Sequence, residues 1–91
     1  MTLSELKQAN VQWFARGNKK FFGDVSYKVL HSKKTGEPYL IRSTYAWSDM
    51  LGSKRTLHYR INSIKEDRTI GHLIDNIFSD IYAVKAWLKE N

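Results

Sequence analysis

Three runs in which apolar and polar residues alternate constrain the fold of this chain more than any other feature. The first run begins at Phe21, the second at Tyr39 and the third at about Arg55. Alternation with a period of two is typical of a strand with one buried face. The segments between the runs, SKKTGEP and SDMLGSK, contain the Gly, Ser and Pro residues that form hairpin loops. The sequence therefore predicts three antiparallel strands joined in consecutive order, a β-meander.

The alternation also predicts which side chains face the core. We expect the inward positions to be mostly aromatic or aliphatic: Phe21, Gly23, Val25, Tyr27 and Val29, then Tyr39, Ile41, Tyr45 and Trp47, then Leu57, Tyr59 and Ile61. We expect the outward positions to be in water: Phe22, Asp24, Ser26 and Lys28, then Arg42, Thr44 and Ala46, then Thr56, His58, Arg60 and Asn62. Leu40 does not fit this alternation.

Helices are predicted at both ends of the chain. The stretch TLSEL is a capping box, in which the Thr2 side chain caps a short helix and Glu5 reaches back to the Thr2 amide. Near the other end, an apolar stripe at helical spacing is made of Ile77, Ile81, Val84 and Leu88. Ser79 is the expected N-cap of this amphipathic helix. Packed on the inward face of the sheet, the helix would complete a two-layer α+β domain and leave the outward face wet.

Residues 11–16 fit two structures. Val11, Trp13 and Ala15 alternate with polar or aromatic neighbours as in a strand, and Gly17 and Asn18 would then form a tight hairpin turn into a four-stranded sheet. If these residues are instead helical, Gly17 ends the helix as its C-cap. The sequence leaves both alternatives open.

Length and composition bound the class of protein. The 91 residues are enough for a single domain, residues 1–91, with one core. The chain has no cysteine, so disulfides and thiolate metal sites are excluded. It also has no apolar run near the ~18 residues that a membrane span requires, and no apolar segment of a signal peptide. We expect a soluble cytoplasmic protein without a membrane partner.

The charge balance favours an acidic partner. Fifteen Lys and Arg residues against nine Asp and Glu give a net charge of +6 and an isoelectric point near 9.7, which is typical of nucleic-acid-binding domains. In a meander, one end of the sheet gathers five cations: Arg16, Lys19, Lys20, Lys54 and Arg55. The outward face would extend this cluster with Lys28, Arg42 and Arg60, and with the ring of Phe22.

These positions predict a small non-enzymatic protein that grips the phosphate backbone of DNA or RNA. The alternative interpretation is that they form a solvated sheet face, with lysines at the strand ends that oppose edge-to-edge pairing. A second function is a protein-binding inhibitor or modulator, of the kind that viruses or mobile elements encode. It would dock on an acidic surface of a partner, which could itself be a nucleic-acid enzyme, with Met50 and Leu51 as apolar anchors. A homo-oligomer joined through a strand edge is a third possibility.

Metal binding finds no support in the sequence, and catalysis finds a single hint: Asp24, Asp49 and His58 would lie near one end of the sheet, where a small nuclease would need acid–base groups. His31, His58 and His72 do not have the spacing of metal ligands. There is no glycine-rich phosphate loop and no nucleophile elbow. We therefore expect neither an enzyme nor a bound cofactor or metal.

The predicted order of helix, three antiparallel strands and helix resembles that of the double-stranded-RNA-binding domain. That family places a lysine cluster at the start of its last helix to hold phosphates, whereas the approach to the last helix here, from Asp75 to Asp80, is acidic. The resemblance covers element order alone and assigns no functional residue.

Overall fold

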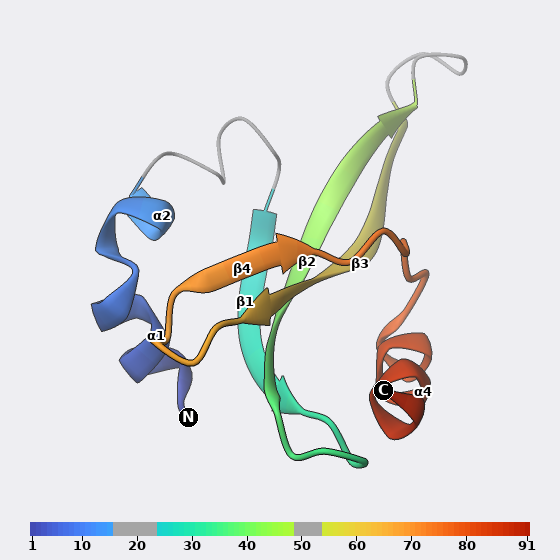
Figure 1. Ribbon diagram of the computed structural model, residues 1–91. Helices are drawn as coiled ribbons and strands as arrows, with labels where there is room; N and C mark the ends of the chain where they lie inside the picture. Colours follow the sequence, from blue (N-terminus) through green and yellow to red (C-terminus); the bar gives the residue numbers. More distant parts are fainter. Residues whose placement is uncertain (16–23, 49–53) are drawn as a thin grey trace.

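The fold is α+β, with a four-stranded antiparallel sheet, a C-terminal helix and a short helical segment at the N-terminus (Figure 1). A computed structural model describes residues 1–15, 24–48 and 54–91. Its elements are α1 (Leu3–Ala9), α2 (Val11–Ala15), β1 (Asp24–His31), β2 (Pro38–Ser48), β3 (Lys54–Ile64), β4 (Ile70–Leu73) and α4 (Ile81–Glu90). The predicted class, the antiparallel sheet and the helices at both ends are confirmed.

The strands lie in the order β1-β2-β3-β4, and each is antiparallel to its neighbours. The fourth strand is formed by β4, whereas residues 11–15 are helical as α2. A tight turn joins β3 to β4: the Lys65 amide donates to the Thr69 carbonyl at 2.8 Å, and Arg68 has a positive φ of 71°. Gly71 lets the strands approach, since a Cβ there would clash with the Ser63 hydroxyl oxygen.

The main apolar core lies between the sheet and α4. Ile41 and Ile61, which are opposite each other on β2 and β3, pack with Val84 and Leu88 of α4. Trp87 of α4 also meets the ring of Tyr39 edge to face, with a centroid separation of 5.2 Å. The inward positions of β2 and β3 were therefore identified correctly at Tyr39, Ile41 and Ile61.

The start of α4 differs from the sequence prediction. Its N-cap is Asp80 rather than Ser79, because the Asp80 carboxylate accepts a hydrogen bond from the Ala83 amide at 2.8 Å. Ile77 precedes the helix and is 64% exposed, so it is not part of the buried stripe. Phe78 is buried instead, held by paired backbone hydrogen bonds of 2.8 and 3.0 Å with Tyr59 of β3.

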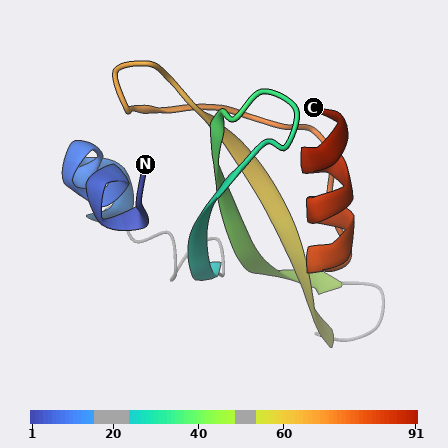
Figure 2. The same ribbon diagram turned by 90° about the horizontal axis from the view of Figure 1, so that it is seen from below.

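The helices α1 and α2 lie on the side of the sheet opposite α4 (Figure 2). The face that we expected to be wet is therefore largely covered, and the domain has three layers rather than two. Leu6 of α1 and Leu40 of β2 are both 0% exposed, yet neither belongs to the core under α4. Leu40 breaks the alternation because β2 carries apolar side chains on both faces, and each face needs its own cover.

The pairing of β1 reverses the faces that we assigned to that strand. Tyr27 lies opposite Arg42, and Lys28 lies opposite Ile41. Directly paired residues share a face, so Tyr27 faces α2, where its ring contacts Phe14 at a centroid separation of 5.1 Å. The alternation of β1 is a poor guide because Val29 and its neighbour Leu30 are both apolar and both half-buried.

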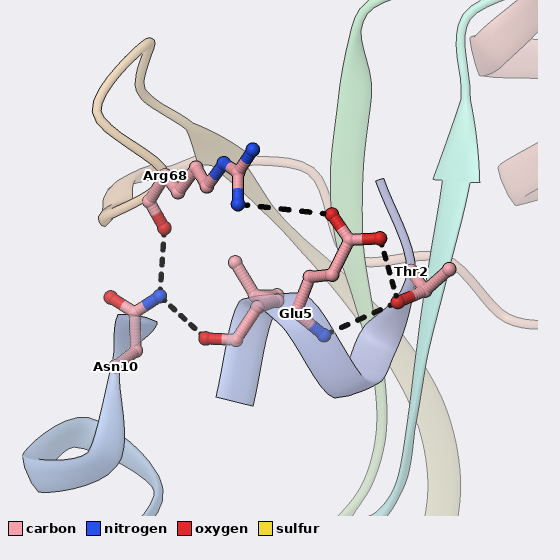
Figure 3. Close-up of polar contacts among 5 residues, drawn as sticks. Thr2, Glu5, Asn10 and Arg68 are labelled. Carbon is pink, nitrogen blue, oxygen red and sulfur yellow. Dashed lines mark hydrogen bonds and ion pairs between the residues drawn. The ribbon is translucent and has the colours of Figure 1, made fainter. Parts of the chain in front are cut away.

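Polar contacts fix the N-terminal helices to the β3–β4 turn (Figure 3). The Asn10 side-chain amide donates to the carbonyls of Leu6 and Arg68, both at 2.8 Å, and its oxygen accepts from the Ile70 amide at 3.0 Å. Thr2 caps α1 as predicted, accepting from the Glu5 amide at 3.2 Å. The Glu5 carboxylate, however, accepts from the Thr2 hydroxyl, and it forms an exposed ion pair with Arg68 at 3.9 Å.

No described helix has both the length and the apolar character needed to cross a membrane.

We expect Asn10→Ala to lower the free energy of unfolding by about 2–3 kcal/mol. The substitution would leave the Arg68 carbonyl and the Ile70 amide without their hydrogen-bond partner at a site where Asn10 is 9% exposed. Urea unfolding followed by circular dichroism measures the change. Asn76→Ala, at an exposed position before α4, is the matched control and should change stability by less than about 0.5 kcal/mol. Equal effects of the two substitutions would contradict this role of Asn10.

Candidate nucleic-acid interface

The predicted cation cluster at the end of the sheet is placed only in part. Lys54 and Arg55 open β3, and their backbones pair with Ser48 and Trp47 of β2. Several predicted contact residues lie outside the described residues: Arg16, Lys19, Lys20 and Phe22, and also Met50 and Leu51 of the alternative protein-binding loop. The start of β1, at Asp24, pairs with Thr44, so the start of β1, the end of β2 and the start of β3 share one end of the sheet.

The strands β2 and β3 continue past β1 at this end as a two-stranded arm (Figure 1). The arm consists of residues 45–48 paired with residues 54–57, beyond the last β1 partner, Thr44. Leu57 lies at the base of the arm and is 40% exposed, although we expected it in the core. The arm therefore carries the backbone of Lys54 and Arg55 away from the packed part of the domain.

Arg42 and Arg60 lie directly opposite each other on β2 and β3. Both side chains are half-buried, on the face that α1 and α2 cover. Arg42 is held in place: its Nε donates to the Asn62 side-chain oxygen at 3.1 Å, and its guanidinium lies 6.0 Å from the ring centroid of Trp13. Asn62 is only 7% exposed, so its oxygen depends on this bond.

Arg60 lacks such support. Its Nε is buried and has no hydrogen-bond partner, and no carboxylate of the described residues pairs with its guanidinium. A buried donor without an acceptor costs about 1–3 kcal/mol, and like charges directly opposite on neighbouring strands repel. An anion with several oxygen acceptors would relieve both costs, and guanidinium groups match the geometry of phosphate.

The three cations that we expected together on the outward face, Lys28, Arg42 and Arg60, are divided between the two faces of the sheet. His58 follows on the same face as Arg60, opposite the buried Thr44. Lys28 is exposed, but it shares the α4 face with Ile41. The face of β1, β2 and β3 that holds Arg42 and Arg60 therefore lacks Lys28.

The role of Trp13 was not predicted from the sequence. Its ring meets Phe14 at a centroid separation of 4.9 Å and Tyr27 at 6.1 Å, so the three rings form a cluster beside Arg42. Two adjacent aromatic residues on a five-residue helix are the signal for such a contact, because a helix that short needs packing to be stable. With the strand alternative open for residues 11–16, that signal could not be assigned to a face.

The described residues offer little for other chemistry. No three His, Asp or Glu side chains in this part of the chain lie close enough together to hold a metal ion. Hydrogen bonds from the hydroxyl and the amide of Thr69 lower the pKa of the Asp67 carboxyl, but Asp67 lies in the β3–β4 turn. The lowered pKa of Asp67 is therefore explained by a contact within the turn and does not mark a reactive group.

Comparison of the chain with protein-family models, with curated proteins and with solved structures gave no match.

We expect Arg60→Met and Arg42→Met to change stability in opposite directions. Arg60→Met removes a buried donor without a partner and should raise the free energy of unfolding by about 1 kcal/mol. Arg42→Met leaves the buried Asn62 oxygen without its donor and should lower the free energy of unfolding by about 1–2 kcal/mol. Urea unfolding of both variants measures the difference. Destabilisation by Arg60→Met as large as that by Arg42→Met would show that Arg60 is satisfied in the folded protein.

Proposed function

We propose that this protein binds nucleic acid without catalysing a reaction on it, and that it grips the phosphate backbone through the face and end of its sheet. The observation that carries the proposal is the Arg42–Arg60 pair: the two arginines lie directly opposite each other on β2 and β3, and the buried Nε of Arg60 has no hydrogen-bond partner among the described residues. Protein folding alone does not explain this arrangement, because it costs stability. A phosphate group at the pair would supply the missing acceptors.

The net charge of +6 supports the same function. A positive protein attracts a polyanion over distances of about a Debye length, ~8–10 Å at moderate salt. Contacts to phosphate hold the protein on the nucleic acid but do not read its sequence. We therefore propose weak sequence preference and strong dependence of affinity on salt.

The β2–β3 arm favours duplex DNA among the nucleic acids. The arm is a two-stranded ribbon that extends past β1, and Lys54 and Arg55 belong to its β3 strand. The major groove of B-form DNA is wide enough for a two-stranded ribbon. Arg16, Lys19, Lys20 and Phe22 precede β1 and stay in the proposed contact set, whereas Lys28 is left out because it lies on the other face.

We expect the affinity for duplex DNA to fall steeply with salt. If five phosphates are contacted, a plot of log K against log salt concentration has a slope of about −4 to −5. Arg60→Gln and Lys54→Gln should each weaken binding and make the slope less negative by about 0.9, because each removes one phosphate contact. Fluorescence anisotropy with a labelled 16-base-pair duplex at several salt concentrations measures both quantities.

Lys65→Gln is the matched control for these variants. It removes the same charge from an exposed position in the β3–β4 turn, so it should lower the affinity only slightly. If Arg60→Gln and Lys54→Gln behave like Lys65→Gln, the protein responds to net charge alone and the proposed contact face is wrong. Single-stranded DNA and duplex RNA of the same length, titrated alongside, compare the three classes of nucleic acid.

A further inference from the structure

A groove of about 560 Å³ lies between the end of β1 and α4, apart from the arginine pair. Its floor is apolar, with Val29, Leu30 and Leu88, and its rim is basic, with Lys33, Lys85 and Lys89. Val29 and Leu30 are neighbours in β1 and point to opposite faces of the sheet. A hollow that both of them line must run along the edge of the strand.

Among the described residues, β1 pairs only with β2, because it is the first strand in the order, and its other edge, at this groove, is unpaired. In an antiparallel pair, the backbone groups of successive residues point alternately towards the partner and away from it. The Ser32 amide donates to the Glu37 carbonyl at 2.9 Å and so points towards β2. By alternation, the backbone groups of His31 and Val29 point away from β2, towards the groove that both residues line.

The wall opposite this edge is already in position. The Lys33 amide donates to the Leu88 carbonyl at 2.9 Å, which ties the β1–β2 hairpin to the last turn of α4. On α4, Tyr82, Lys85 and Lys89 fall on one side at spacings of three and four residues, and Tyr82 is 77% exposed. Both walls of the groove, the edge of β1 and one side of α4, are therefore in place before a ligand binds.

The charge of the groove selects the ligand. Lys33, Lys85, Lys89 and His31 are all exposed, and no carboxylate lines the groove. None of the three lysines forms an ion pair within the described part of the chain. The rim is thus complementary to negative charge, while the floor is complementary to apolar side chains.

We infer that this groove binds an acidic peptide segment in an extended conformation, which adds to β1 as a fifth strand. The main chain of the peptide would pair with the free backbone groups of Val29 and His31. Alternate side chains would point to the apolar floor and to the lysine rim, as in other cases of strand addition. A nucleic acid meets the charge requirement but has no peptide main chain to continue the ladder of hydrogen bonds at a strand edge.

The inference is independent of nucleic-acid binding, because the groove and the Arg42–Arg60 pair share no residue. Either can fail while the other holds.

The test uses a fluorescein-labelled seven-residue peptide that alternates Glu with Val, titrated with the full chain and followed by anisotropy. We expect binding, and we expect Lys85→Glu to weaken it about fivefold or more, since the reversal replaces an attraction by a repulsion at the rim. Lys65→Glu makes the same change of charge in the β3–β4 turn and should weaken binding less than twofold. No binding, or equal loss with both variants, would overturn the inference.

A second probe separates strand pairing from charge attraction. The same peptide with alternate backbone amides N-methylated keeps its charges and side chains but loses hydrogen-bond donors. Only every second amide of the peptide would point to β1, so both alternate sets of amides are methylated in turn, and methylation of one set should weaken binding at least tenfold. Bound peptide should also slow hydrogen exchange of the Val29 and His31 amides. Strand addition would be contradicted if both methylated peptides bound with unchanged affinity. It would also be contradicted if a single-stranded oligonucleotide displaced the peptide and slowed exchange of the same two amides.

Discussion

The fold depends on one constraint: two adjacent residues of β2, Leu40 and Ile41, must both be buried. They are 0% and 1% exposed, and neighbouring side chains of a strand point to opposite faces. Burying a leucine or isoleucine side chain stabilises a protein by about 1.5–3 kcal/mol, so the sheet needs a cover on each side. α4 supplies one cover, and the N-terminal helices with Leu6 supply the other.

The two covers differ in kind, and the difference explains the arginine pair. The α4 side is mainly apolar, with Ser43 as a buried polar residue, whereas the side of α1 and α2 contains several buried polar groups, Asn10, Thr44 and Asn62. An apolar layer would exclude guanidinium groups entirely. Here Arg42 can be half-buried because Asn62 and Trp13 stabilise it, and Arg60 lies beside it without equivalent support. Residues that lower the stability of the fold are often those that contact a ligand.

Strand and helix positions were largely readable from the sequence, but the placement of one element against another was not. Period-two runs and the capping box at Thr2 identify β1, β2, β3 and α1, because each is a local pattern. β4 escaped prediction because four residues that include Gly71 carry no clear period. The single outlier, Leu40, marked the second covered face. Reading it required knowing that α2 is a helix. Whether the buried Nε of Arg60 has a hydrogen-bond partner depends on tertiary contacts, so no local sequence pattern could predict it.

The contacts of Asn10 also set an order of events during synthesis. Its partners, Arg68 and Ile70, lie 58 and 60 residues further along the chain, so Asn10 cannot make these contacts until the β3–β4 turn has been synthesised. Pairings of such high sequence separation form slowly, because the intervening loop must close first. Until then the face of β2 that carries Leu40 is uncovered and can contact other chains. The nascent chain is consequently most vulnerable to aggregation after β1, β2 and β3 have paired and before the β3–β4 turn has formed its contacts with Asn10.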